Sequence, residues 1–440
     1  MQYPKHILTL ITLPARIFSV VVLLLSSTLV VMSQNPQRVL YSFTGGADGA
    51  QPHQGLIFDQ AGNLYGTTFY GGIYGAGTVY RLTPNGDGTW KQTVLYSFTG
   101  GDDGGYTDWG SLAFDAAGSL YGVTVFAGQY GQGTLFRLSP NPDGTWTESV
   151  LHQFTGGEDG TMPRTTPFFD TAGNLYGTAA YGGAYGCGTV YKMTPGPGNE
   201  WTFGVIHQFM DDPACSPWVG LTPDTSGNLY GTTRNTLLGC TDPPQECGTV
   251  FELTPSSDGT WAFKVIHQFI GSDGSDPSVT GLIFDEAGNL CGLTQFGGRY
   301  SAGVLYKLVP GEHDSWTYQV LHDLDSSRDG GHPASQIVRD AFGSLYATGF
   351  DGGAYGYGTF FKASPNSDGS WRFSVQYNFT GSDGANPLGL VRDSAGHIFG
   401  TTNVGGAYGN GVVYEFTPVS PCALCLAPRY DGSVRWADRW

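Results

Sequence analysis

The sequence contains few charged residues, and basic residues are especially scarce. Only 13% of its 440 residues are charged, and 20 Lys and Arg stand against 37 Asp and Glu, which gives a formal net charge of −17. A surface of this sign repels nucleic acid and anionic lipid. Because no basic patch interrupts it, we exclude nucleic-acid binding and do not expect the protein to bind membranes by charge.

The sequence also lacks the short motifs that mark common enzyme classes. It contains no G-x-S-x-G, no H-E-x-x-H and no phosphate-binding G-x-x-x-x-G-K-[ST]. We therefore assign no catalytic residue and expect no metal and no cofactor. The 37 acidic residues leave one alternative open, which is a catalytic carboxylate pair that only the fold would bring together.

The N-terminus has the pattern of an export signal. Lys5, His6 and Arg16 precede an apolar run over 17–32, and this order is typical of a secretory signal peptide. We predict a signal peptide over 1–33. Its removal takes away two basic residues and no acidic ones, which changes the net charge from −17 to −19. An uncleaved membrane anchor is the alternative, because apolar residues before Arg16 lengthen the run.

Glycine and aromatic residues are abundant, and they recur in a repeated unit. The chain has 69 glycines, and "GNLYGTTFYGGIYGAGTVYRLTP" from Gly62 returns with small changes from Gly118 and Gly173. A hairpin motif of the form D-x-x-G-[NSH]-[LI] marks seven copies, 53 to 61 residues apart, through the aspartates Asp59, Asp115, Asp170, Asp224, Asp285, Asp340 and Asp393. Each copy holds four short β-rich runs, and no helical periodicity lies between Gln37 and Pro418.

Four antiparallel strands repeated seven times predict an all-β fold, a seven-bladed β-propeller of four-stranded blades. The first copy is preceded by a lone strand, 38–43, and the seventh copy lacks its own fourth strand. We expect the N-terminal strand to complete the last blade and close the ring, which protects edges that would otherwise aggregate. The propeller is predicted over 34–418, and 419–440 forms a C-terminal tail.

Loop lengths predict the strand order within a blade. The link between the fourth strand of one copy and the first strand of the next is long, so the "GLIFD" strands should line the axis and the tryptophan strands the rim. By strand alternation, Trp90, Gln92, Val94, Tyr96 and Phe98 should share one face. We interpret the aromatic residues of this face as packing between blades.

Two sets of polar residues resemble metal ligands, but we interpret both as structural. Histidines at equivalent rim positions would lie too far apart for one zinc ion, and tyrosine replaces them in other copies; they are His152, His207, His267 and His322. The seven hairpin aspartates could ring one mouth of the channel and hold a cation. An aspartate just before Gly-Asn is, however, what an Asx-type turn requires.

The loop between the second and third strands supplies our candidate binding residues. Six copies place a tyrosine at the same point of a glycine-rich loop: Tyr74, Tyr130, Tyr185, Tyr300, Tyr355 and Tyr408. Tyrosine combines an apolar face with a polar tip and suits contact with sugars or an extended partner. The alternative is that each tyrosine fills the gap to the next blade.

The seven cysteines predict disulfides in an exported chain. Cys187 and Cys215 should lie on the same face of adjacent blades and form one bridge. Cys240 and Cys247 could join the enlarged loop of copy four, and Cys422 with Cys425 forms a C-x-x-C pair in the tail. Cys291 replaces the tyrosine of "NLYG", and we expect a buried free thiol there.

The repeated units "GNLYGTTFYGGIYGAGTVYRLTP" and "DGTWKQTVLYSFTGGADG" resemble the GloVer tandem repeat of exported bacterial proteins classed as choice-of-anchor proteins. The resemblance covers 39–418. It implies a secreted or surface-attached β-propeller and brings no catalytic residues. Copy four departs from the pattern because it lacks both the "GG-x-YG" loop and the "DG-x-x-P" turn, and the tail contains no attachment signal of the kind that members carry.

Together these patterns predict a monomeric, exported, non-catalytic propeller that acts as a recognition or structural module at or outside the cell surface. Its partner would be an extracellular glycan or a surface protein. We expect the ligand on the face that carries the six tyrosines and the irregular loops of copy four, because a departure from repetition is what a site on a scaffold looks like. The alternative is a polysaccharide-active hydrolase or lyase with acidic residues on the same face.

Overall fold

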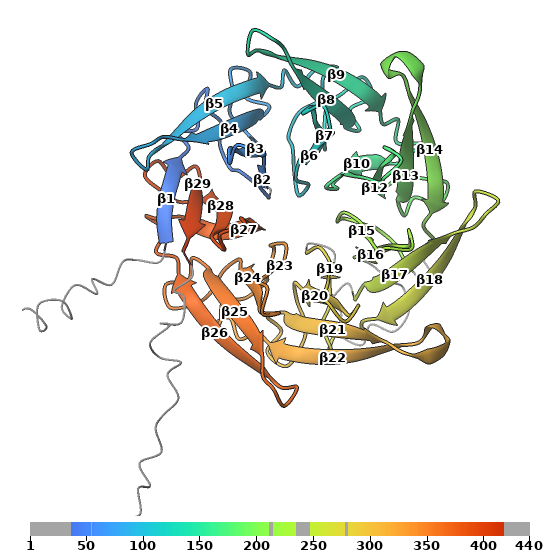
Figure 1. Ribbon diagram of the computed structural model, residues 1–440, viewed down its shortest axis with the longest axis vertical. Coiled ribbons are helices and arrows are strands. Elements are labelled where there is room, and N and C mark those ends of the chain that lie inside the picture. Colours follow the sequence, from blue (N-terminus) through green and yellow to red (C-terminus); the bar gives the residue numbers. More distant parts are fainter. Residues whose placement is uncertain (1–36, 54, 211–213, 235–246, 278–279, 418–440) are drawn as a thin grey trace, which may run out of the picture. The chain divides into compact units, whose positions relative to one another are not determined.

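The computed structural model describes residues 37–53, 55–210, 214–234, 247–277 and 280–417. These residues form seven antiparallel sheets arranged as blades around a central axis (Figure 1). They contain two single-turn 3-10 helices, η1 (Pro197–Asn199) and η3 (Glu312–Asp314), and no α-helix. No helix in this part of the chain is long and apolar enough to cross a membrane. The fold is the predicted seven-bladed β-propeller.

Blades 1 to 6 each run from a two-residue inner strand to an eight-residue outer strand, whereas the inner strand of blade 7 has eight residues. The inner strands are β2 (Ile57–Phe58), β6 (Ala113–Phe114), β11 (Phe168–Phe169), β15 (Thr222–Pro223), β19 (Ile283–Phe284), β23 (Val338–Arg339) and β27 (Ala385–Arg392). The second strands are β3 (Leu64–Thr68), β7 (Leu120–Thr124), β12 (Leu175–Tyr181), β16 (Leu229–Thr233), β20 (Leu290–Thr294), β24 (Leu345–Gly349) and β28 (Ile398–Val404). As predicted, the "GLIFD" strands are innermost.

In blades 1 to 6 the two remaining strands have seven and eight residues and pair along most of their length. In blade 7 they have five and six residues. The third strands are β4 (Thr78–Pro84), β8 (Thr134–Pro140), β13 (Thr189–Pro195), β17 (Thr249–Pro255), β21 (Val304–Pro310), β25 (Thr359–Pro365) and β29 (Val412–Phe416). The outer strands are β5 (Trp90–Ser97), β9 (Trp146–Gln153), β14 (Trp201–Gln208), β18 (Trp261–Gln268), β22 (Trp316–Asp323), β26 (Trp371–Asn378) and β1 (Gln37–Ser42). Blade 3 gains one further strand, β10 (Thr161–Pro163), which pairs with β12.

The N-terminal strand closes the ring, as predicted. β1 pairs antiparallel with β29, so blade 7 has the order β1-β29-β28-β27 and combines both ends of the repeat region (Figure 1). Without β1, the backbone N–H and C=O groups of β29 would form an open edge. The signal peptide predicted over 1–33 and the tail over 419–440 lie outside the described residues.

The hydrophobic core is divided among the seams between blades. There are seven clusters of buried residues, and each draws its members from two neighbouring blades. Between blades 7 and 1, for example, Tyr80 and Leu82 pack with Phe399 and Val413. Tyr80 also explains the glycine of "LYG", because a Cβ on Gly66 would lie 2.5 Å from the Tyr80 hydroxyl.

The predicted single face of the outer strand is wrong in its second half. In β5, Val94 pairs with Tyr80 and Tyr96 pairs with Val79, so one extra residue is inserted between them. This β-bulge reverses the side on which the following side chains point. Trp90 therefore packs in the seam with blade 7, whereas Tyr96 and Phe98 pack in the seam with blade 2. The aromatic residues do pack between blades, as predicted, but they are divided between the two seams on either side of the blade.

The seven hairpin aspartates form the predicted turns. Asp59 Oδ1 accepts hydrogen bonds of 2.9 Å from the backbone N–H groups of Ala61 and Asn63, and the Tyr65 hydroxyl donates to Oδ2 over 3.0 Å. The equivalent backbone bond from the residue four positions later recurs in the six other copies. The carboxylates of these aspartates therefore accept hydrogen bonds within their own turns.

Ring closure gives a first prediction. Deleting Gln37–Ser42 should leave β29 as an open edge and remove the contacts of β1 with two seams, so the melting temperature should fall by roughly 5–10 °C or the protein should aggregate. Thermal melting and size-exclusion chromatography would measure this. A chain that begins at Gln37 is the control and should behave like the starting protein; equal melting of both chains would contradict closure by β1.

Candidate functional site: the link face

The blades expose two different faces. One face carries the long links from each outer strand to the next inner strand, together with the loops between second and third strands, and we call it the link face. Backbone bridges such as Ala50 to Tyr70 and Gly105 to Phe126 join a link to a loop on this face. The opposite face carries the tight turns that follow Asp59 and its equivalents, and we call it the turn face.

The six predicted tyrosines lie on the link face, near its outer edge. In four of the blades, the N–H of the residue before the tyrosine donates to the side chain of the last residue of its own outer strand, as Ala184 does to Gln208 and Ala354 to Asn378. The tyrosines are therefore spread around the ring and do not converge on the axis. Each keeps 49–62% of its surface exposed, so none of them is buried between blades.

Closer to the axis, the links differ from blade to blade. Most copies have a proline in the link, and the position that follows this proline is described in six blades. The residues at this position, or at its equivalent, are His53, Asp108, Arg164, Trp218, Ala334 and Leu388. The repeat therefore keeps this position in space and varies the side chain. Four consecutive blades place titratable or hydrogen-bonding side chains there, whereas blades 6 and 7 place aliphatic ones.

Four of these residues form one connected network with Arg234, which follows β16 of blade 4, and Asp276, which lies in the link to blade 5. We call this network the charged arc: His53, Asp108, Arg164, Trp218, Arg234 and Asp276. Asp108 accepts from two neighbours, since its Oδ1 lies 3.0 Å from His53 Nδ1 and its Oδ2 lies 3.0 Å from Arg164 Nη2. The guanidinium carbons of Arg164 and Arg234 lie 4.4 and 4.2 Å from the centre of the Trp218 ring. Arg234 Nε in turn lies 3.2 Å from Asp276 Oδ2.

The charged arc borders the central axis. Two residues after Arg164, the Thr166 hydroxyl accepts hydrogen bonds from the Ser111 N–H over 2.8 Å and from Gln336 Nε2 over 3.4 Å. Gln336 belongs to blade 6 and Thr166 to blade 3, which are not neighbours in the ring, so this contact crosses the axis. Thr166 and Gln336 also line a cavity of about 190 Å³, together with Val219, Leu282 and others.

A disulfide braces the link that carries Trp218. Cys187, in the loop of blade 3, is bonded to Cys215, three residues before Trp218, as the sequence predicted. Cys291 is buried with a free thiol, also as predicted. One member of the expected Cys240–Cys247 bridge, Cys240, lies outside the described residues, and so do both cysteines of the Cys422–Cys425 pair.

The rim histidines pack between blades. His152 stacks on Phe203 with ring centres 3.8 Å apart, and its Nε2 lies 3.0 Å from Asp159 of the following link. His267 and His322 repeat both contacts, with ring stacking at 4.2 and 3.8 Å. Burial lowers the pKa of His207, which stacks on Phe263, to about 4. Each histidine thus packs in the seam of its own blade, and Tyr41 and Tyr96 take the equivalent place in other seams.

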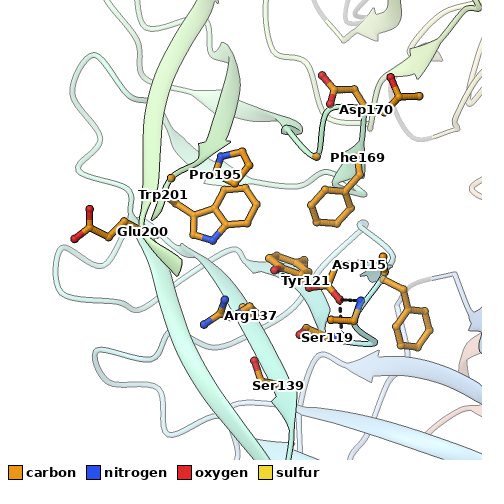
Figure 2. A pocket seen from close by; sticks show the side chains of 16 residues that line it. Asp115, Ser119, Tyr121, Arg137, Ser139, Phe169, Asp170, Pro195, Glu200 and Trp201 are labelled. Carbon is orange, nitrogen blue, oxygen red and sulfur yellow. Dashed lines mark hydrogen bonds between the residues drawn. The ribbon is translucent and has the colours of Figure 1, made fainter. Parts of the chain in front are cut away.

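The turn face contains a second candidate site, a cavity of about 640 Å³ between blades 2 and 3. Figure 2 shows the rings of Tyr121, Phe169 and Trp201 gathered around this space, with Arg137 beside them. The same tyrosine–tryptophan pair recurs at three other seams, with ring centres 5.9–6.4 Å apart. The cavity therefore follows from the repeat itself, whereas the charged arc does not.

Sequence reasoning missed the charged arc. The residues are single, come from five blades and match no motif, so spacing could not bring them together. For His53, Asp108, Arg164 and Trp218 the available signal was the position after the link proline or its equivalent, which varies while its surroundings repeat. Gly49, Pro52 and their equivalents mark that position in most copies.

Fold and site together define a class: a closed, seven-bladed β-propeller of tandem repeats, with its non-repeating polar residues gathered on the link face. The chain belongs to the Gloeobacter/Verrucomicrobia repeat family, whose sequence profile matches residues 27–237 and 236–427. This confirms the resemblance seen in the sequence. No curated protein sequence matches the chain significantly.

Some solved structures resemble this chain at low sequence identity. A protein of unknown function from Dyadobacter fermentans is 12% identical, with 87% of this chain and 98% of that chain covered and a TM-score of 0.44. A gluconolactonase from Xanthomonas campestris is 16% identical, with 77% of this chain and 89% of that chain covered and a TM-score of 0.39. At these levels the similarity does not bear on function.

Glu148 on β9 carries a buried carboxyl group at a seam. Its equivalents in four later outer strands are aromatic residues that stack on the histidine or pack in the seam: Phe203, Phe263, Tyr318 and Phe373. Glu148 Oε1 is buried and has no hydrogen-bond partner among the described residues. Burial, together with the negative charge of Asp103, raises the pKa of Glu148 from its ordinary 4.5 to about 7.

This pKa shift gives a second prediction. Between about pH 4.5 and pH 7 the folded protein holds a proton on Glu148 that the unfolded chain has released, so the free energy of unfolding should fall as the pH rises through this window. Glu148→Gln should raise the melting temperature by roughly 2–4 °C at pH 8 and leave it unchanged near pH 4.5. The exposed Glu158→Gln is the control, and a pH-independent effect of Glu148→Gln would contradict the assignment.

Proposed function

We propose that this protein is an exported, non-catalytic recognition propeller whose link face binds an extracellular glycan or surface protein. One observation carries the proposal. Of the 14 large hydrophobic side chains that are exposed in the described residues, 12 lie on the link face, and only Val320 and Phe342 lie elsewhere. An accumulation of exposed apolar side chains on one face is typical of an interaction surface.

The chemistry of these side chains supports contact with a polymer. Eight of the 12 are tyrosines, which offer a ring face and a hydroxyl at little cost in conformational entropy. Their spread around the outer edge gives a broad surface in place of one deep pocket. A long glycan chain or the surface of a protein fits this arrangement better than a small metabolite does.

Binding also fits the buried carboxylates better than hydrolysis does. Glycoside hydrolysis requires a protonated acid beside a second carboxylate. On the link face, Asp108 and Asp276 have side chains only 6% and 3% exposed, and each faces an arginine. Each carboxylate lies against a guanidinium, an arrangement that positions an arginine and does not pair two carboxylates.

Export is the second part of the proposal. The apolar N-terminal segment, the Cys187–Cys215 disulfide and the repeat family all support it. Disulfides persist mainly in oxidising compartments. Fractionation of cells that express the full chain with a C-terminal tag should place it in the medium or on the cell surface, and a cytoplasmic location would contradict this part of the proposal.

The tyrosines provide the test of the binding face. Tyr355→Ala with Tyr408→Ala removes two exposed rings from neighbouring blades, and binding to a glycan array should weaken roughly 10- to 100-fold. Phe342→Ala is a matched control, because Phe342 is 88% exposed but lies on the turn face. Thermal melting of each variant confirms folding.

Three outcomes are distinguishable. Loss of binding in the tyrosine variant alone supports the link face. Loss in the Phe342 variant alone moves the site to the turn face. Absence of glycan binding in every variant, including the starting protein, removes the glycan from the proposal and leaves a protein partner.

A further inference from the structure

We propose that the charged arc is a subsite for a carboxylate-bearing sugar, so that the glycan recognised by the link face contains uronic acid. This inference rests on the proposed function and specifies its ligand. The six tyrosines offer contact with sugar rings in general, whereas the charged arc supplies groups that distinguish an acidic sugar from a neutral one.

The scaffold itself does not require these charges. At the same link position, blades 6 and 7 use Ala334 and Leu388, which are 4% and 1% exposed, and the ring closes equally well there. Replacing a buried ion pair by apolar residues is commonly neutral or stabilising, whereas burying charges has a desolvation cost. Two arginine–aspartate pairs on one face are therefore better explained by a ligand than by stability.

The network leaves hydrogen-bond donors without acceptors. Arg164 Nε and Trp218 Nε1 are both buried and have no hydrogen-bond partner among the described residues. Arginine and tryptophan nitrogens can only donate. These two donors therefore lack an acceptor, and a ligand rich in acceptor oxygens would complement them.

The arginines specify the kind of acceptor. A guanidinium presents its N–H groups in a planar fork that matches the two oxygens of a carboxylate. Asp108 holds Arg164 through Nη2, and the Trp218 ring also supports the guanidinium, whose carbon lies 4.4 Å from the ring centre. The side chains of Arg164 and Arg234 remain 12% and 27% exposed, so part of each guanidinium can still be reached from outside.

A strained tryptophan lies beside the arc. Trp109 follows Asp108 directly and has a φ of +57°, a conformation that bulky residues rarely adopt. The ring is half-buried, and its centre lies 6.4 Å from that of His53. Strain of this kind persists where the surrounding structure holds a residue in place for a purpose, and a partly exposed indole at the edge of the charged arc is suited to contact with a pyranose ring.

The net charge of the protein makes a local cationic site necessary for such a ligand. A chain with a formal charge of −17 repels polyanions over most of its surface. Only 20 Lys and Arg are available, and the charged arc brings Arg164 and Arg234 to one aromatic ring. Binding of an acidic glycan would therefore depend strongly on these two residues.

The test compares an acidic oligosaccharide with its neutral counterpart. Isothermal titration calorimetry of the purified protein would use an oligogalacturonate and a galacto-oligosaccharide of the same length and linkage. We expect the acidic sugar to bind more tightly, and Arg164→Met to weaken its binding roughly 10- to 100-fold, since hydrogen bonds to charged groups are worth about 1.5–3 kcal/mol.

Two further variants separate recognition from folding. Arg164→Lys keeps a cation beside Asp108 but removes the planar fork, so the fold should be unchanged while affinity for the acidic sugar drops. Arg137→Met is the matched control, because Arg137 Nε is likewise buried without a partner but lies at the cavity of the turn face (Figure 2). It should leave binding unchanged.

The outcomes separate this inference from the proposed function. Selective loss of acidic-sugar binding in both Arg164 variants supports the inference. Equal binding of acidic and neutral sugars that depends on Tyr355 and Tyr408 but not on Arg164 overturns the inference and leaves the proposed function standing. Failure of the acidic sugar to bind also overturns the inference, and the glycan array then decides the proposed function independently.

Discussion

Packing across the seams between blades is the constraint on which the rest of the structure depends. A four-stranded blade has two apolar faces and is stable only if neighbours cover both. Here all seven hydrophobic clusters lie between two blades, including the seam that β1 helps to form. The bulge in each outer strand contributes to this packing. In β5 it allows Trp90 to pack against one neighbouring blade and Phe98 against the other.

Because each blade must fit two neighbours, most positions of the repeat cannot vary freely. Strand residues, turn aspartates and seam histidines are all fixed by contacts that recur around the ring. Variation is tolerated where the chain leaves the seams, which is in the links and loops of the link face. The position after the link proline combines a fixed place near the axis with a free choice of side chain, and this is how Asp108, Arg164 and Trp218 come together from three blades.

The same reasoning explains what could be predicted from the sequence. The blade count, strand order, closure by β1 and the Cys187–Cys215 bridge follow from local periodicity and from the order of elements. The bulge at Val94–Tyr96 was missed because one inserted residue leaves no mark in an alternating pattern. The charged arc was missed because its residues are near one another only in the closed ring. A repeat is recognised by the residues that its copies share, whereas the charged arc is made of residues that differ between copies.

The central claim is that ligands are recognised on the link face, at the residues where the repeat varies. Hydrogen–deuterium exchange of the purified protein, with and without saturating oligogalacturonate, tests this claim most directly because it maps both faces in one experiment. We predict slower exchange in the links over 106–111, 161–166 and 216–220 and unchanged exchange in the turns over 59–63, 115–119 and 170–174. Binding that protects only those turns, with the links unchanged, would contradict the account.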